Sequence, residues 1–522
     1  MDRRILLQKV EFSELINKLF SKTCKFMHKN ENLIYKILLL LSLLSYFFYN
    51  YSYALIKGGR WDLNQHIAMA DRLLDGKGFY YSASEASSPY FPGLGFLSVI
   101  VGLVFGDYRG YVLLALASLV GTLFLFVLIR ISTALTGNKW ISLVVVCYIM
   151  NRSFITYKFY MNEFKADTLI YLFGFLLVLT INRYSNDKAY YKQFIILFIL
   201  SFIMDITKQQ ALYIDVALGV YIVFTKRFKL NEKIKILIPM LLAGLLDLVV
   251  LFSISGMRLL TIDNLKNMPY FGTYHIVHEI LNVYDEQKWV VLLSLVVIII
   301  VLILRKKIEV DSLFYMWLLI AICVLAGQIA GGMKIGGNKG NYEAGLVLFV
   351  PFVPIAYDYL IKTFIKIDKR QLLYVVLVYW IYICRCFDLD DISSIVNHNY
   401  GSTETERYLN EHYCGIECIY DSDHYMMIKN SGLIPAVDIY TIPIFCEEYY
   451  SYTADLINER KYSVIIVYSS DLKMFDDQTE KYFGYNPHSF EALEENYVLV
   501  EDSEMPAQLV GRIFVLSKGE TD

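Results

Sequence analysis

The sequence predicts a polytopic α-helical membrane protein with about eleven transmembrane helices, followed by a C-terminal extracytoplasmic α/β domain. The first observation is composition. The 522 residues are 56% hydrophobic and 19% charged, with a mean hydropathy of +0.44, which is too apolar for a soluble globular protein. The second is that apolar windows recur along the chain as far as residue 387, where short β-branched runs replace them. The net charge of −3 combines basic loops with an acidic last quarter, so it indicates no nucleic-acid partner.

Each predicted span is a window of roughly 20 residues or slightly fewer, which is the helix length that crosses the hydrocarbon of a bilayer. The windows are Leu33–Leu55, Tyr111–Arg130, Trp140–Tyr157, Thr168–Ile181, Phe194–Ile206, Ala211–Phe224, Ile236–Ile254, Trp289–Leu304, Leu313–Ala330, Ala344–Ile361 and Leu372–Phe387. The run Gly93–Phe105 is shorter than a span, and we expect it to lie at the outer interface or to dip into it. Residues 1–32 mix apolar residues with lysine at helical spacing, which predicts an amphipathic helix on the cytoplasmic surface.

The distribution of lysine and arginine predicts the orientation, because these residues mark cytoplasmic loops. They gather before the first span and in alternate loops, at residues 3–29, 130–139, 183–192, 226–235, 305–307 and 362–370. The loops between these, and everything after Phe387, are then predicted to face outward. A skew toward Tyr, Ile and Lys over Ala suggests a bacterium with a low GC content, so the predicted location is a bacterial plasma membrane.

The tail, residues 388–522, is predicted to form the α/β domain because helical patterns alternate with β-branched runs. The helices are expected at Thr403–His412, Tyr425–Ser431 and Glu447–Arg460, and the strands at 418–420, 464–467, 498–500 and 513–516. The tail has no glycine-rich nucleotide motif, which leaves a lid or a docking module as its expected role. Cys414 and Cys418 either pair as a disulfide in an oxidising compartment or remain free, with Cys418 packed in a strand.

Polar clusters recur in the loops that are predicted to face outward. The first such loop, Lys57–Pro92, contains Asp62, and a second contains Glu163, Lys165 and Asp167 just before a span. Further clusters are Asp205–Gln210 and Gly331–Glu343. Charges at membrane depth cost about 2.5 to 3.5 kcal/mol each on insertion scales, so they are candidates for function.

Two simpler interpretations of these charges remain open. Asp205 and Lys208 are three residues apart and would satisfy each other on a helix. Asp167 at the start of a helix is also favoured by the helix dipole, without any role in catalysis.

Four sequence segments together resemble the GT-C superfamily of membrane glycosyltransferases. They are Y-F-P-G-L-G-F at 90–96, F-K-A-D-T-L-I-Y-L-F-G-F at 164–175, T-K-Q-Q-A-L at 207–212 and G-N-K-G-N-Y-E-A-G-L at 337–346. Within this superfamily, the chain resembles the bacterial members similar to protein O-mannosyltransferases and lipid A aminoarabinose transferases. The resemblance covers residues 33–387 and implies that Asp62 acts on the acceptor and that Asp167 supports the site. Many relatives have two adjacent acids in the first loop, whereas Leu63 and Asn64 follow Asp62, so a divalent cation is a possible cofactor and its ligands are undefined.

The resemblance implies an inverting transfer of a sugar to an extracytoplasmic acceptor. The implied donor is a polyprenyl phosphate whose lipid lies in the bilayer. The leaving phosphate monoester has a second pKa of about 6, so it needs cations rather than a general acid. One carboxylate base with nearby lysines is therefore sufficient, and Asp62 is the expected base. The residues expected to bind substrate are Glu163, Lys165, Lys208, Gln209, Lys339, Asn341 and Tyr342.

Two other classes of function compete with the transferase. A transporter or flippase for polyprenyl-linked glycans is expected to show internal repeats and paired broken helices near the middle of the membrane. The chain has no matching halves, although Asp205–Asp215 is a candidate for one such break. The other class is a non-catalytic assembly protein whose tail binds partners.

Overall fold

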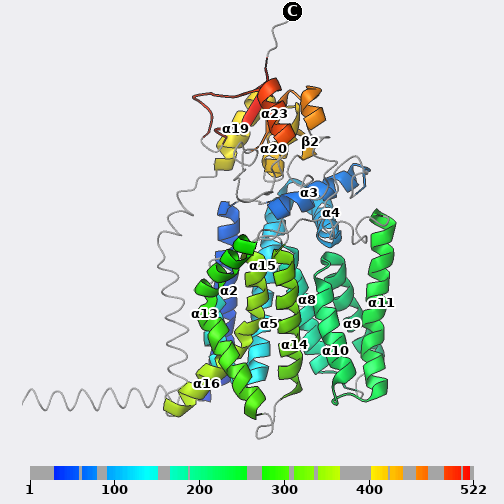
Figure 1. Ribbon diagram of the computed structural model, residues 1–522, viewed down its shortest axis with the longest axis vertical. Coiled ribbons are helices and arrows are strands. Elements are labelled where there is room, and N and C mark those ends of the chain that lie inside the picture. Colours follow the sequence, from blue (N-terminus) through cyan, green and yellow to red (C-terminus); the bar gives the residue numbers. More distant parts are fainter. Residues whose placement is uncertain are drawn as a thin grey trace, which may run out of the picture.

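The computed structural model describes most of the chain, and every structural statement below refers to this part. The described residues are 29–57, 61–78, 91–150, 165–185, 189–255, 273–304, 311–333, 339–364, 401–420, 424–438, 454–467, 487–506 and 509–517. They form a bundle of helices with a small α/β unit at one end (Figure 1). We call this end of the bundle the sheet end.

The helices of the bundle follow the predicted spans. They are α2 (Glu31–Lys57), α5 (Arg109–Thr136), α6 (Lys139–Tyr148), α8 (Ala166–Asn182), α9 (Tyr190–Thr207), α10 (Ala211–Phe224), α11 (Leu230–Ser255), α13 (Thr273–Leu304), α14 (Ser312–Gly332), α15 (Lys339–Leu346), the 3₁₀-helix η3 (Val347–Phe352) and α16 (Val353–Phe364). Within the described residues, α2, α5, α9, α11, α13 and α14 each contain a stretch long and apolar enough to cross a membrane, and five shorter helices or helical stretches are also apolar. The chain is therefore a multi-pass membrane protein, as predicted. The predicted span at 372–387 and the predicted surface helix before residue 29 lie outside the described residues.

The predicted span Ala344–Ile361 is not one regular helix. The chain changes from α15 to η3 and then to α16, and Pro351 lies within η3. Proline lacks the N–H of a regular helix and crowds the preceding turn, which favours a tighter local winding. Hydropathy alone does not detect this change, because every residue of η3 is apolar and buried.

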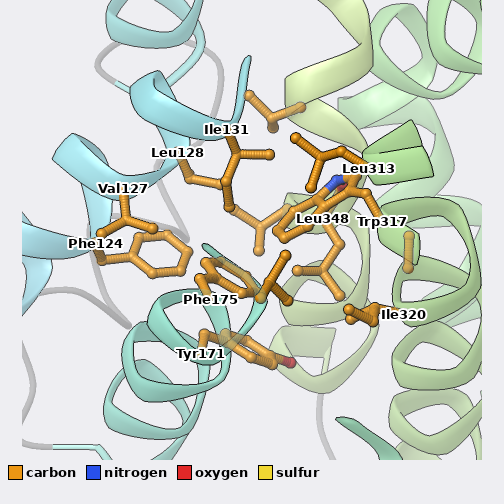
Figure 2. Packing of buried hydrophobic residues seen from close by; sticks show 14 of the residues in the cluster. Phe124, Val127, Leu128, Ile131, Tyr171, Phe175, Leu313, Trp317, Ile320 and Leu348 are labelled. Atoms are coloured by element: carbon orange, nitrogen blue, oxygen red, sulfur yellow. The ribbon is translucent and has the colours of Figure 1, made fainter. Parts of the chain in front are cut away.

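Aromatic side chains hold α5, α8, α14 and η3 together at the centre of the bundle (Figure 2). The Trp317 ring contacts Phe175 edge-on, with centroids 4.7 Å apart, and Phe175 contacts Phe124 at 5.3 Å. The Trp317 indole donates a hydrogen bond to the carbonyl oxygen of Leu348 at 2.8 Å. Burying an indole requires such a partner, so these contacts fix how α14 and η3 lie against α8.

Two further helices lie between the bundle and the α/β unit (Figure 1). They are α3 (Trp61–Leu74) and α4 (Gly93–Phe105), and the 3₁₀-helix η1 (Gly106–Tyr108) joins α4 to α5. The short apolar helix predicted at residues 93–105 is therefore present with the same bounds. Its start abuts the end of α9, because a Cβ atom on Gly93 would lie 2.9 Å from the carbonyl oxygen of Ile206.

The α/β unit contains a five-stranded sheet in the order β2-β1-β3-β5-β4. Its strands are β1 (Glu417–Tyr420), β2 (Ile434–Asp438), β3 (Val464–Ile466), β4 (Tyr497–Leu499) and β5 (Ile513–Leu516), and its helices include α19 (Gly401–Tyr413), α20 (Tyr425–Asn430) and α23 (Pro487–Asn496). Strands β2, β1 and β3 are parallel, whereas β5 is antiparallel to both β3 and β4.

Strand β2 is absent from the sequence prediction. Its sequence, I-P-A-V-D, contains Pro435, which argues against an interior strand. In the structure β2 is an edge strand, where the missing N–H of proline is tolerated.

Cys414 and Cys418 are both free, so the disulfide that the sequence left open is not formed. Cys418 is fully buried in β1, and burial raises the pKa of its thiol to about 12.

Candidate active site

A buried ion pair joins two of the residues that the sequence singled out. The Lys208 ammonium lies 2.8 Å from the Asp167 carboxylate, and the side chains are 17% and 9% exposed. Asp167 lies in the first turn of α8, and Lys208 follows the last residue of α9, where the backbone becomes extended. This pair connects helix ends that are 41 residues apart in sequence.

The local pairing of Asp205 with Lys208 is therefore wrong as an interpretation. Because α9 ends at Thr207, Lys208 does not continue the helix on which that pair depends. Asp205 instead shares a hydrogen bond with Asp215 of α10.

Gln328 of α14 extends the network around Asp167. Its side-chain amide donates a 2.7 Å hydrogen bond to the Tyr171 hydroxyl and a longer one, 3.4 Å, to Asp167. Gln328 is 1% exposed. Gln328 was not predicted from the sequence, because it lies within a strongly apolar span, 161 residues from Asp167. A glutamine in such a span is the signal that was available, since amides are uncommon in apolar helices.

Lys165 adds a second cation beside the same carboxylate. It is the N-cap residue of α8, its side chain is half-buried, and its charge acts on Asp167. Among the described side chains at this position, two lysines accompany one aspartate. Such a centre suits an anion, because the Lys208 ammonium carries three N–H donors and its contact with Asp167 occupies only part of them.

Other predicted site residues lie near this centre through close packing. A Cβ atom on Gly331 would lie 3.3 Å from the Gln210 amide nitrogen, which brings the turn 208–210 against the end of α14. The buried ring of Tyr342 packs on Gly332, where a Cβ atom would lie 2.7 Å from the ring. The start of α15 and the turn after α9 therefore converge on the end of α14. Gln209, in the same turn, is exposed.

The remaining predicted residues are placed only in part. Asp62 is the second residue of α3, but its side chain lies outside the described residues, as do the side chains of Lys339 and Asn341 in α15. Glu163 also lies outside them. Helix α3 contacts α4, whose start abuts the end of α9. The roles of Asp62, Glu163, Lys339 and Asn341 remain predictions.

A second charged cluster, which the sequence analysis missed, surrounds Asp71 of α3. Its carboxylate receives hydrogen bonds from Arg109 at 2.6 Å, from the Tyr425 hydroxyl at 2.6 Å and from Lys429 at 2.5 Å. Burial raises the pKa of Asp71, but the hydrogen bonds from Lys429 and Tyr425 and the charge of Arg109 more than offset it. The pKa therefore lies below its ordinary value. The partners are 38 to 358 residues away, which explains why no local pattern indicates them.

A metal site is not defined by the part of the chain that the structure describes. No three His, Cys, Asp or Glu side chains in that part are arranged to hold a metal ion. Asp247 of α11 is 3% exposed, and neither of its carboxylate oxygens has a hydrogen-bond partner among the described residues.

No protein-family model and no curated protein matches the sequence. Solved structures do match. The oligosaccharyltransferase of Archaeoglobus fulgidus, tethered to an acceptor peptide, matches with a TM-score of 0.52 and 10% identity over 91% of this chain and 73% of that one. ArnT from Cupriavidus metallidurans matches with a TM-score of 0.53 and 8% identity over 88% of this chain and 93% of that one.

The chain has a GT-C fold. A third structure, the archaeal oligosaccharyltransferase AglB with an inhibitory peptide and a dolichol-phosphate, matches with a TM-score of 0.50 and 10% identity over 94% of this chain and 75% of that one. The resemblance found in the sequence motifs is thus confirmed for the fold. At these identities the likeness extends to the GT-C architecture and to no individual residue.

Proposed function

We propose that this protein is an inverting glycosyltransferase that moves a sugar from a polyprenyl phosphate to an acceptor on the outer face of a bacterial plasma membrane. The observation that carries the proposal is the GT-C fold, which matches two membrane glycosyltransferases over about nine tenths of the chain. The AglB structure contains a dolichol-phosphate, which supports a lipid-linked donor here. The basic loops support an orientation with the sheet end outside.

The proposed reaction needs one base and one anion-binding centre. The acceptor hydroxyl gives its proton to Asp62 while its oxygen attacks the anomeric carbon. The bond from that carbon to the phosphate oxygen breaks, and its electron pair leaves with the polyprenyl phosphate. Lys165 and Lys208 stabilise the departing phosphate, since both cations lie beside Asp167 at the sheet end.

Asp167 has a supporting role in this proposal. Its carboxylate holds the Lys208 ammonium at 2.8 Å, and the hydrogen bond from Gln328 fixes the carboxylate in turn. A lysine held in this way loses less side-chain freedom when the phosphate binds, so the site is preorganised. Lys339, Asn341 and Tyr342 of α15, with Gln209, would line the same region, and Glu163 completes the predicted set.

The test uses purified protein in vesicles with a short polyprenyl phosphate that carries one labelled sugar. We expect Asp62→Asn to abolish the acceptor-dependent release of polyprenyl phosphate, because the amide does not accept the proton. Asp75→Asn is the matched control, since Asp75 is an exposed acid just after the same helix, and it should retain activity. Full activity in Asp62→Asn would remove Asp62 from the role, and movement of the intact lipid without release would indicate a flippase.

A further inference from the structure

Asp71 connects three parts of the molecule through one carboxylate. Arg109 belongs to the first turn of α5 and therefore to the bundle, whereas Tyr425 and Lys429 belong to α20 of the α/β unit. All three donate to Asp71, which lies near the end of α3. Among the described elements, α3 contacts α4, α5 and α20.

The Asp71 contacts differ from an ordinary surface ion pair because Arg109 is buried and Asp71 is largely buried. The side chains of Asp71 and Arg109 are 13% and 7% exposed, whereas Lys429 is 45% exposed. The Arg109 side chain packs closely on Gly102 of α4, since a Cβ atom there would lie 3.0 Å from its guanidinium. Exposed pairs contribute little, but a buried carboxylate with three charged or polar donors strongly resists rearrangement.

Apolar packing surrounds the same contact. Residues from α3, α4 and α5 share a hydrophobic cluster with Tyr425, Ile428 and the buried faces of β1 and β3. Met426 of α20 lies against Gly110 at the start of α5. The α/β unit is therefore docked on α3 and α5, and Asp71 is the charged centre of this docking surface.

We propose that Asp71 is a positioning residue, which holds α3 in register between the bundle and the α/β unit and thereby sets the location of Asp62. Asp62 and Asp71 lie on the same helix, nine residues and thus about 14 Å apart along its axis. Because a helix of this length moves as a unit, a tilt of α3 at Asp71 displaces Asp62 as well. This inference rests on the proposed function only for the role of Asp62.

The first test compares turnover in variants that remove the contact from the α/β side. The double variant Tyr425→Phe/Lys429→Met keeps the ring, the side-chain stem and the Asp71–Arg109 pair but removes both donors of α20. We expect kcat to fall by about 10- to 100-fold, because a misplacement near 1 Å has effects of this size. The KM for the lipid-linked donor should change little, since a base acts in the transition state. Lys429→Arg keeps a charged donor and should retain activity.

A matched control removes an exposed ion pair from the same unit. Arg407 and Glu411 lie on α19 with 73% and 61% of their side chains exposed. Arg407→Met should leave kcat unchanged. A loss equal to that of the double variant would mean that any change in the α/β unit impairs the enzyme, which would overturn the specific role of Asp71.

The second test measures the position of α3 without reference to activity. Lys77, just beyond α3, and Tyr111 on α5 are both exposed and can carry spin labels. The distance between these two labels reports where α3 lies on the bundle. A second pair, at Lys77 and Glu411, reports docking of the α/β unit. We expect both distance distributions to broaden in the double variant.

Three outcomes separate the two proposals. Unchanged distance distributions in the double variant would overturn the positioning role. Broadened distributions in a double variant that keeps the wild-type kcat would overturn it as well. If the wild-type protein transfers no sugar, the proposed function fails. The Lys77–Tyr111 distances then still decide whether the Asp71 contacts hold α3.

Discussion

The ion pair between Asp167 and Lys208 allows a quantitative test of the site. Both side chains are largely buried, and the atoms are 2.8 Å apart. Removing one partner of a buried pair leaves an uncompensated charge, which costs about 3 to 5 kcal/mol. Because Lys208 retains 17% exposure, we expect Asp167→Asn and Lys208→Met each to lower the free energy of unfolding by about 3 kcal/mol, near the lower limit.

The double variant distinguishes a true pair from two separate losses. Asp167→Asn/Lys208→Met removes both charges of the pair, so its loss should be smaller than the sum of the single losses by about 2 kcal/mol or more. Denaturant unfolding in detergent, followed by tryptophan fluorescence, gives the three differences. The hydrogen bond from Gln328 and the attraction to the Lys165 charge are changed alike in Asp167→Asn and in the double variant, so they largely cancel in this cycle.

Asp285 and Lys288 provide the matched control. Their atoms are 2.7 Å apart, closer than in the buried pair, but the side chains are 77% and 44% exposed. The same substitutions there should change stability little, because solvent screens an exposed pair. Equal effects at the two pairs, or additive effects at Asp167 and Lys208, would refute the reasoning that burial makes the Asp167–Lys208 pair important.

Two further predictions follow from the fold. Because the pKa of Asp71 lies below its ordinary 3.8, docking of the α/β unit should remain complete above that pH and weaken only as pH falls further, as followed by the spin-label distances. Loosening between pH 5 and 7, or an equal acid response in Asp71→Asn, would contradict this. Gly327→Ala should lower the free energy of unfolding by about 1 to 3 kcal/mol, and with it the unfolding midpoint, because the added Cβ would overlap the Tyr213 ring. A Cβ at Gly219 would meet open space, so Gly219→Ala should leave the unfolding midpoint unchanged. Equal midpoints for the two variants would contradict the packing of α10 on α14.

Hydropathy predicted the helices of the bundle well because the requirement is local. A helix in lipid must satisfy its backbone hydrogen bonds within itself, so each crossing appears as a continuous apolar window. The predicted spans up to residue 361 overlap the helices of the structure for this reason. The tail was predicted less completely, since a short edge strand containing Pro435 has no clear local pattern.

The polar partnerships of the sheet end were not predictable in the same way. The lysine after α9 was recognised as unusual, but the only partner that local spacing offered was Asp205, as an open alternative, whereas the structure places its partner at Asp167 on α8. Gln328 and Asp71 were not singled out at all. Each depends on a neighbour contributed by another element, and a single sequence does not specify which helices lie side by side.

By itself, the sequence determined that this chain is a polytopic membrane protein, where its helices lie and which loops concentrate charge. These properties depend on the free energy of transferring short segments into lipid, which is set by residues close together in the chain. Only the tertiary structure decided that Lys208 neutralises Asp167 and that Asp71 joins the bundle to the α/β unit. A buried charge takes the partner that packing brings within hydrogen-bond reach, and that partner can be hundreds of residues away.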